Sequence, residues 1–218
     1  MKIALIGASG FVGTALLSEL LARGHQVTAL VRDPAKALPA AVTVKVADAF
    51  DAAAVAQAVE GQDAVISAFN PGWNAPDLYD QFLNGSAAIE QGVARGGVKR
   101  LLVVGGAGSL LVAPGVQLVD SANFTDHVPA NVIPGARAAR DALTRIRANT
   151  TLDWTFVSPP AMLAPGARSG KYRLGGEDLL MDGDQPAGIS VADLAVAIVD
   201  EIETPRHLKA RFTVASVN

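Results

Sequence analysis

Short apolar runs alternate with stretches of helical period along the whole chain. The runs at 2–6, 26–31, 42–46, 63–67, 99–104, 154–157 and 211–215 predict strands. Apolar residues at helical spacing predict helices over 10–23, 51–59, 76–95, 136–147 and 190–202. This alternation predicts an α/β fold, in which a doubly wound, mostly parallel sheet with right-handed crossovers carries helices on both faces.

The ends of several predicted helices carry capping signals. Gly24 and Gly61 follow the last periodic residues of two helices, and Asp51 precedes the first residues of another. Ser190, followed by Asp193, is expected to cap the last helix as in a capping box. The first helix is expected to bury the face that carries Phe11, Ala15, Leu16, Leu20 and Leu21.

One segment has no clear period, and a later one has the pattern of a hairpin. Residues 105–134 are rich in turn formers and leave the carboxyl end of a predicted strand, where such sheets bind ligands, so we expect a functional loop. Residues 172–174 and 179–181 predict a small hairpin around Gly175 and Gly176.

A glycine-rich turn joins the first strand to the first helix. Gly7, Gly10 and Gly13 suit a sharp turn, a close approach of backbone to a ligand, and tight packing of helix on strand. The free N–H groups at the start of the helix attract phosphate. Because the pattern lies between a predicted strand and a predicted helix, it indicates a dinucleotide-binding turn.

Composition excludes several classes of protein. The 218 residues contain no cysteine, which excludes disulfides and thiol chemistry, and His25, His127 and His207 show no metal-ligand spacing. The net charge of -3 includes no basic run, so we expect no nucleic-acid partner. No apolar run reaches the ~18 residues of a membrane helix, and the first strand begins at Lys2, so we expect no signal peptide and a cytoplasmic monomer or homodimer.

Later stretches of the chain carry a family resemblance. The segments 153–159, 170–173 and 189–193, together with the glycine turn, resemble the NAD(P)H-binding subgroup of atypical short-chain dehydrogenases/reductases. The match is to the NADH-flavin reductase-like family, single-domain relatives of NmrA-like and biliverdin reductase B-like proteins. It covers essentially the whole chain. The resemblance implies one NAD(P)-binding Rossmann-like domain over 1–218, with a small substrate-side portion at about 159–189.

The resemblance also implies cofactor contacts. The glycine turn would hold the pyrophosphate, the pair after the third strand would meet the adenine, and the loop after the fourth would line the cofactor. The ends of the fifth and sixth strands would lie beside the nicotinamide. The implied residues are Gly7, Ser9, Gly10, Phe11, Val12, Gly13, Asp48, Ala49, Ser67, Ala68, Phe69, Gly105, Gly106 and Pro159.

One departure from the family pattern concerns the proton donor. Classical and extended short-chain dehydrogenases/reductases carry Tyr-x-x-x-Lys at the start of the helix after the fifth strand, but here that helix begins Gly135-Ala136-Arg137 and contains neither residue. The only tyrosines are Tyr79 and Tyr172, and neither has Lys four positions later. The catalytic residues are therefore unassigned. A flavin or quinone acceptor, which can take its proton from solvent, would suit this deficit.

Arg32 follows the second strand, where Arg accommodates the 2′-phosphate of NADP, whereas an acidic residue binds the ribose of NAD. This position favours NADP, although the neighbouring Asp33 could instead serve NAD.

Candidates for a small-molecule acceptor pocket lie on loops at the carboxyl edge: Trp73, Phe124, His127, Pro160 and Met162. Trp73 and Phe124 could equally anchor their own loops, and a single loop histidine is commonly a surface residue.

Three functions remain open from the sequence. The first is an NAD(P)H-dependent oxidoreductase that reduces a flavin, quinone or related ring. The second is a non-catalytic, NmrA-like NADP sensor. The third, a sugar-nucleotide epimerase or dehydratase, ranks last because such enzymes generally need the Tyr/Lys pair and a separate substrate domain.

Overall fold

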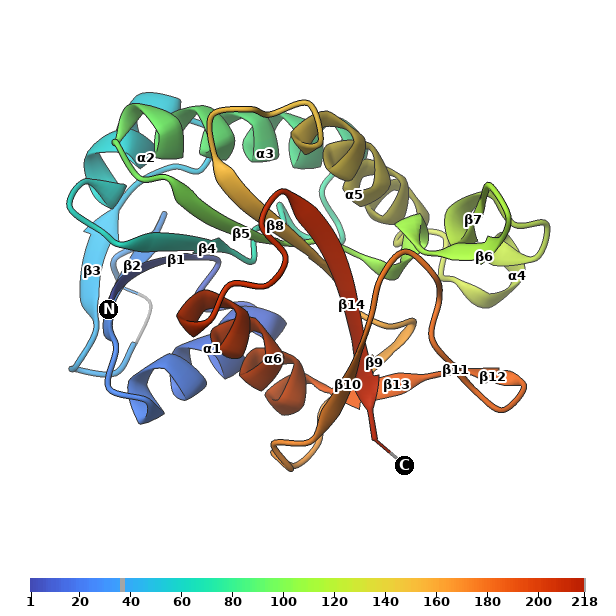
Figure 1. The fold of residues 1–218 in the computed structure, drawn as a ribbon. Helices are drawn as coiled ribbons and strands as arrows, with labels where there is room; N and C mark the ends of the chain where they lie inside the picture. Colours follow the sequence, from blue (N-terminus) through green and yellow to red (C-terminus); the bar gives the residue numbers. More distant parts are fainter. Residues whose placement is uncertain (36–37, 218) are drawn as a thin grey trace.

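A computed structural model describes residues 1–35 and 38–217. One eight-stranded sheet has the order β10-β14-β8-β5-β4-β1-β2-β3 (Figure 1). Neighbouring strands are parallel except for β10, which runs antiparallel to β14. The predicted doubly wound, mostly parallel sheet is confirmed. Its strands are β1 (Lys2–Ile6), β2 (Gln26–Val31), β3 (Thr43–Val46), β4 (Ala64–Ser67), β5 (Arg100–Val104), β8 (Asp153–Ser158), β10 (Tyr172–Gly175) and β14 (Ala210–Ser216).

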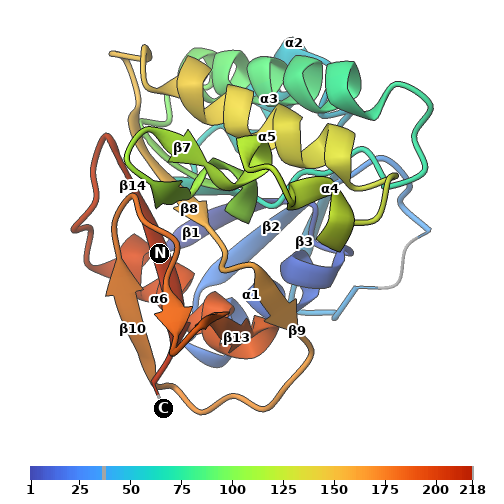
Figure 2. The same ribbon diagram turned by 90° about the vertical axis from the view of Figure 1, so that its right-hand side faces the viewer.

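Helices cover both faces of the sheet. The helices α1 (Phe11–Ala22) and α6 (Val191–Glu203) lie on one face, and α2 (Ala52–Val59), α3 (Leu78–Arg95) and α5 (Ile133–Ile146) lie on the other (Figures 1 and 2). Each face buries its own apolar cluster, with Leu16 and Phe212 in one and Ile89 and Phe156 in the other. Central strands buried on both faces are typical of parallel sheets.

The expected helix caps are present. Asp51 Oδ1 accepts hydrogen bonds from the amides of Ala53 and Ala54, and Ser190 Oγ accepts one from the amide of Asp193. Gly24 and Gly61 have φ of +77° and +76°, the left-handed conformation that suits glycine after a helix. The helix predicted from 136 begins earlier, at Ile133, because Pro134 lies in the first turn, where no backbone donor is needed.

Phe11 is not part of the buried face of α1. Its side chain is 50% exposed, whereas Leu17, which the helical pattern did not select, is 4% exposed. Phe11 is the first residue of the helix, within the glycine turn and five positions beyond the last residue of β1. The predicted inward position of Phe11 is therefore wrong.

The predicted hairpin of 172–174 with 179–181 is also wrong. Strand β10 pairs with β14, and β11 (Met181–Asp182) pairs with β12 (Gln185–Pro186) around Gly183, whose φ is +60°. The free edge of β14 offers a full row of backbone partners to β10. Sequence alternation identified the strand at 172 but not its partner.

The segment between β5 and α5 consists of short elements rather than one irregular loop. It contains the 3₁₀ helices η1 (Ala107–Ser109) and η2 (Leu118–Asp120), the paired strands β6 (Leu111–Ala113) and β7 (Val116–Gln117), and α4 (Phe124–His127). Beyond β8, the strands β9 (Met162–Ala164) and β13 (Gly188–Ser190) form a separate parallel pair. Figure 2 faces this side of the molecule, with α4 above β9.

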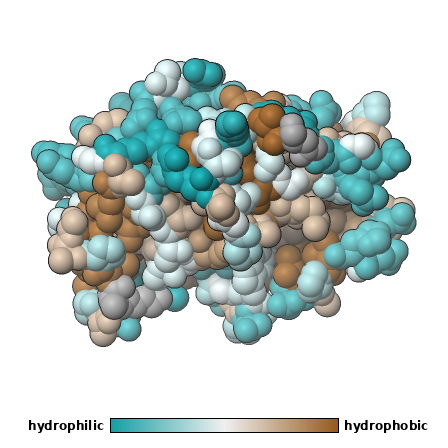
Figure 3. All heavy atoms as spheres, turned by 90° about the horizontal axis from the view of Figure 1, so that it is seen from below, coloured by the Kyte–Doolittle hydropathy of each residue, from teal (hydrophilic) through white to brown (hydrophobic). Residues whose placement is uncertain are grey.

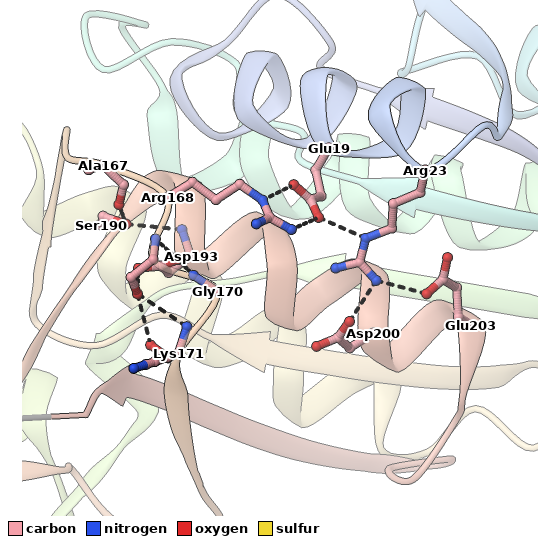
Figure 4. A network of polar contacts seen from close by, with 11 residues as sticks. Glu19, Arg23, Ala167, Arg168, Gly170, Lys171, Ser190, Asp193, Asp200 and Glu203 are labelled. Carbon is pink, nitrogen blue, oxygen red and sulfur yellow. Dashed lines mark hydrogen bonds and ion pairs between the residues drawn. The ribbon is translucent and has the colours of Figure 1, made fainter.

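A polar network ties the segment 165–171 to α1 and α6 (Figure 4). Arg168 donates to both carboxylate oxygens of Glu19 on α1, and Asp193 on α6 accepts from the amides of Ser169 and Gly170. Burial alone would raise the pKa of Asp193, but these hydrogen bonds and one from the Ser169 hydroxyl outweigh it and lower the pKa. On the face that α1 and α6 form, hydrophobic patches alternate with hydrophilic residues (Figure 3).

Candidate functional site

The glycine turn has the geometry that its sequence predicted. Gly7 has φ of +82°, and a Cβ atom there would lie 2.4 Å from the carbonyl oxygen of Ala68. A Cβ on Gly13 would lie 1.9 Å from the carbonyl oxygen of Gly7, so α1 can pack against the end of β1 only with glycine at this position. Gly10 is the N-cap of α1 and donates its amide to the Gly7 carbonyl at 2.9 Å.

The first turn of α1 faces outward without a side-chain cap. The N-cap residue, Gly10, provides no side-chain acceptor for the first amides of α1. The described first turn contains no acidic residue. The described first turn therefore provides neither a side-chain cap nor an acidic residue to offset the positive end of the helix dipole. Such an end attracts an anionic group.

A cavity of about 570 Å³ lies against this turn at the carboxyl edge of β1, β2 and β4. Arg32 and Asp33 enter it from the end of β2. The predicted cofactor residues in its lining are Gly7, Ser9, Gly10, Arg32, Ala49, Ala68 and Phe69. Its lining also includes residues that sequence reasoning missed, each within two positions of a residue that it identified: Ile6, Ala8, Leu30, Val31, Ala47, Asn70, Pro71 and Gly72.

The remaining predicted cofactor residues lie outside the lining of this cavity: Phe11, Val12, Gly13, Asp48, Ser67, Gly105, Gly106 and Pro159. Some of them have a structural role. Asp48 accepts from the amide of Phe50 through Oδ1 at 3.0 Å and so stabilises a turn, and Val12 packs against the core. Ser67 is 3% exposed at the end of β4.

Gly105 lies at the end of β5 against the ring of Phe156. Its amide donates to the carbonyl of Val157 at 2.8 Å, and a Cβ atom would lie 2.0 Å from Phe156 Cε1. Packing within the sheet therefore accounts for glycine at 105. Gly106 has more room, since a Cβ atom added there would have Ala139 Cβ as its nearest neighbour, at 3.6 Å.

The five candidate acceptor residues do not meet in one described cavity. Trp73 is 49% exposed and lines a groove of about 500 Å³ with Asn131 and Pro134, separate from the cavity at the glycine turn. A Cβ on Gly135 would lie 2.9 Å from the Trp73 ring, so this ring packs on the start of α5. The loop-anchoring interpretation thus describes Trp73 better than a shared pocket does.

The other acceptor candidates differ in exposure. Phe124 is 6% exposed, which makes it a core residue of α4, whereas Met162 in β9 is 62% exposed. His127 ends α4 at the surface, and Pro160 is buried directly after β8. Met162 and His127 are therefore the candidates among these four whose side chains an external molecule can reach.

A family model described as NAD(P)H-binding matches residues 7–205, a range that includes the glycine turn and the cavity beside it. The chain belongs to the NAD(P)H-binding family. Protein YwnB of Bacillus subtilis is 36% identical over 219 residues, which cover 99% of each chain. No helix in the two described ranges combines the length and apolar character needed to cross a bilayer.

Two solved structures of family relatives superpose over essentially the whole chain. One, from Streptococcus pneumoniae, is 35% identical with a TM-score of 0.85 and covers 100% of both chains. The other, from Bacteroides thetaiotaomicron, is 44% identical with a TM-score of 0.89 and covers 100% of this chain and 97% of the relative. Their names, NADH-flavin reductase and epimerase respectively, are provisional. The comparison confirms the Rossmann-like fold and the resemblance to atypical short-chain dehydrogenases/reductases.

In this member of the NAD(P)H-binding family, both tyrosines are engaged with carboxylates outside the cavity. The hydroxyl of Tyr79 donates to Asp141 Oδ2 at 2.7 Å, and this hydrogen bond, with burial, raises the pKa of Tyr79. Burial and a hydrogen bond to Asp200 raise the pKa of Tyr172 to about 12. Neither tyrosine lines the cavity beside the glycine turn.

Proposed function

We propose that this protein is an NAD(P)H-dependent oxidoreductase that reduces a flavin, quinone or related ring. The observation that carries the proposal is the cavity formed by the glycine turn, the end of β2 and the loop after β4. In sheets of this type, the carboxyl edge at the change in strand order is where dinucleotides bind. The cofactor supplies the hydride when bound, and the chain binds and orients it.

The pyrophosphate would lie over the glycine turn, and the nicotinamide would lie toward Gly105, Gly106 and Pro159. This course follows the carboxyl ends of β1, β5 and β8, which are close in the sheet order. The residues proposed for the adenine end, Asp48 and Ala49, lie just after β3. The substrate-side portion at about 159–189 would then cover the acceptor.

The geometry of the two tyrosines favours a ring acceptor. With both hydroxyls bound to carboxylates away from the cavity, neither is placed to protonate a reduced carbonyl. A flavin or quinone needs no protein acid at that point, because the reduced ring can take its proton from water. The lack of a placed tyrosine acid thus separates the proposed ring reduction from the epimerase or dehydratase alternative.

NADP is the proposed cofactor, and NAD is the alternative. Arg32 is exposed at the cavity and forms no hydrogen bond or ion pair with residues 1–35 or 38–217, so its guanidinium is available to a 2′-phosphate. Asp33, the residue that would serve NAD, already accepts the amide of Ala35 through Oδ1 at 2.9 Å. One carboxylate oxygen of Asp33 is thus used in the turn.

The experiment combines cofactor binding with turnover. Purified protein is titrated with NADPH and with NADH, and oxidation of each is followed with FMN, FAD, riboflavin or menadione as acceptor. We expect acceptor-dependent oxidation of NADPH, slowed when deuterium replaces the transferred hydrogen, and none with Gly10→Val. Tight binding without turnover on any acceptor would contradict the reductase proposal.

That last outcome would favour the second candidate, an NmrA-like NADP sensor that signals through a partner. The missing Tyr-x-x-x-Lys pair is the observation that supports it. We also propose a cytoplasmic location, where the NADPH pool is available; cell fractionation tests this. A monomer or homodimer is expected on sizing.

A further inference from the structure

Arg211 is a buried arginine near the carboxyl end of the sheet. Its side chain is 0% exposed, and it projects from β14 on the face that carries α5, level with Phe156 of β8. Burial of a guanidinium is costly unless hydrogen bonds and a counter-charge compensate it. Its contacts are therefore informative.

The guanidinium of Arg211 reaches three separate segments. One terminal nitrogen donates to the hydroxyls of Ser158 at 3.3 Å and Ser109 at 3.5 Å, which lie 3.2 Å from each other. The other donates to the backbone carbonyl of Glu177 at 2.9 Å and to its carboxylate at 2.5 Å. Partial burial would raise the pKa of Glu177, but hydrogen bonds from Arg211 and Arg147 outweigh it and lower that pKa.

Two of these segments border the proposed nicotinamide position. Ser109 ends η1, which follows Gly105 and Gly106, and its hydroxyl also donates to the Gly106 carbonyl at 3.4 Å. Ser158 ends β8 and directly precedes Pro159. One side chain therefore bonds to the end of β8 and to the loop after β5, the two segments against which the nicotinamide would lie.

The third segment, which contains Glu177, is hydrogen-bonded to the loop after β5. The amide of Leu111 donates to the Glu177 carbonyl, and the amide of Leu179 donates to the Leu111 carbonyl, both at 2.9 Å. The Glu177 carbonyl thus accepts from Leu111 and from Arg211 together. Arg211 connects the substrate-side portion to the loop after β5 through this shared acceptor.

We propose that Arg211 is a positioning residue that fixes the loop after β5 and the turn after β8 for the nicotinamide half of the cofactor. The proposal rests on the proposed function, because it takes the nicotinamide to lie at Gly105, Gly106 and Pro159. Arg211 is buried, so it acts through Ser109, Ser158 and Glu177. The adenine half lies at β2 and β3, five and six positions away in the sheet order, and does not depend on Arg211.

The chain offers a matched control in Arg100. This arginine is also buried in the sheet, at 9% exposure, and it also pairs with a carboxylate, Glu201, and a hydroxyl, Thr155. In both arginines the Nε atom has no partner among the described residues. Arg100 begins β5 and bonds to α6, at the opposite edge of the sheet from the cofactor.

The experiment compares Arg211→Met with Arg100→Met and with Arg211→Lys. Binding of 2′,5′-ADP reports the adenine half, the fluorescence of bound NADPH reports the nicotinamide, and single-turnover oxidation by FMN reports hydride transfer. For Arg211→Met we expect 2′,5′-ADP affinity within about twofold of wild type, altered NADPH fluorescence, and hydride transfer about tenfold slower. Arg211→Lys is expected to recover part of the rate, and Arg100→Met to match wild type in all three measurements.

Unchanged NADPH fluorescence and hydride transfer in Arg211→Met would overturn the proposal, as would a parallel loss of 2′,5′-ADP binding. If Arg211→Met does not fold, the double variant Ser109→Ala/Ser158→Ala keeps the pair of Arg211 with Glu177 and carries the same expectations. If wild type binds NADPH but transfers no hydride, the reductase proposal fails, and the fluorescence comparison still tests the role of Arg211.

Discussion

Glu19 Oε2 lies 2.7 Å from Nε of Arg168, although the two residues are 149 positions apart in the chain. Arg23 donates to the other oxygen of the same carboxylate, also at 2.7 Å, and continues to Asp200 on α6. Glu19 is 5% exposed on the helix that begins at the glycine turn. The pairing therefore fastens the segment 165–171 to the cofactor-side helix (Figure 4).

This pairing predicts a pH dependence of stability. The hydrogen bond from Arg168, opposed by burial and aided by Arg23, lowers the pKa of Glu19 from 4.5 to about 2. A carboxyl group with a lowered pKa in the folded state stabilises the protein above its unfolded pKa, and this contribution is lost as pH falls through the folded pKa. Glu19→Gln removes this charge and should lower the free energy of unfolding by about 1–3 kcal/mol at pH 7. The lower part of this range applies because solvent reaches Arg168 and weakens its ion pair with Glu19.

The measurement is urea unfolding of both proteins between pH 7 and pH 2. The difference between wild type and Glu19→Gln should be constant above pH 4.5 and should disappear as pH approaches 2. Glu60→Gln, at an exposed position after α2, is the control and should show no such difference. A gap between wild type and Glu19→Gln that stays constant down to pH 2 would contradict the prediction.

Arg32→Ala should weaken NADPH binding about tenfold and leave NADH binding within about twofold, because only NADPH carries the phosphate that a guanidinium grips. Fluorescence titration of both cofactors measures this. Asp33→Ala, which alters the neighbouring side chain, is the control. Equal losses for the two cofactors in Arg32→Ala would remove the argument for NADP.

Gly10→Val should weaken dinucleotide binding by about 100-fold while the domain stays folded. The backbone of Gly10 is extended, with φ of −83° and ψ of 175°, which valine adopts readily, and the new Cβ would lie 3.3 Å from the Gly7 carbonyl. The branched side chain would occupy the space above the turn. Calorimetric titration measures the affinity for NADPH, and a thermal melt shows whether the domain is folded. Ser18→Val, at an exposed position on α1, is the control. Retained affinity would mean that the glycine turn has a structural role alone.

Gly105→Ala should destabilise the fold by about 1–3 kcal/mol, since its Cβ overlaps the Phe156 ring. Phe156→Leu in the same chain should reduce the penalty of the added methyl group, which a double-mutant cycle in urea detects. The Cβ atom of Gly106→Ala would make only an ordinary van der Waals contact, so we expect the free energy of unfolding to change by less than about 0.5 kcal/mol. If the two alanine variants were equally stable, packing on Phe156 would not explain glycine at 105.

The parts of the structure that follow from local chemistry were predictable from the sequence. The left-handed backbone at Gly7 and the close approach of Gly13 to Gly7 require glycine, and Asp51 and Ser190 cap helices through bonds to residues two or three positions away. These interactions involve short spans of chain, so the residue type and its spacing carry the information.

Pairings between distant segments were not predictable in the same way. Nothing in the residues at 172–175 identifies β14 as their partner, and nothing at Arg211 identifies Glu177. The acceptor candidates failed to meet for the same reason: Phe124 is buried and Trp73 packs on α5, outcomes that depend on where whole loops lie.

Strands β8 and β14 lie side by side and parallel, with Ser158 opposite Thr213, although the chain between them makes a long excursion through β9 to β13. The pairing of β8 with β14 uses backbone atoms of these two strands, while within the excursion β10 pairs with β14 and Arg168 binds Glu19. Substitutions at positions of the excursion that make no such contact would therefore leave the sheet and the glycine turn unchanged. For the engineer, the exposed turn between β11 and β12 is accordingly the part of 159–189 to randomise.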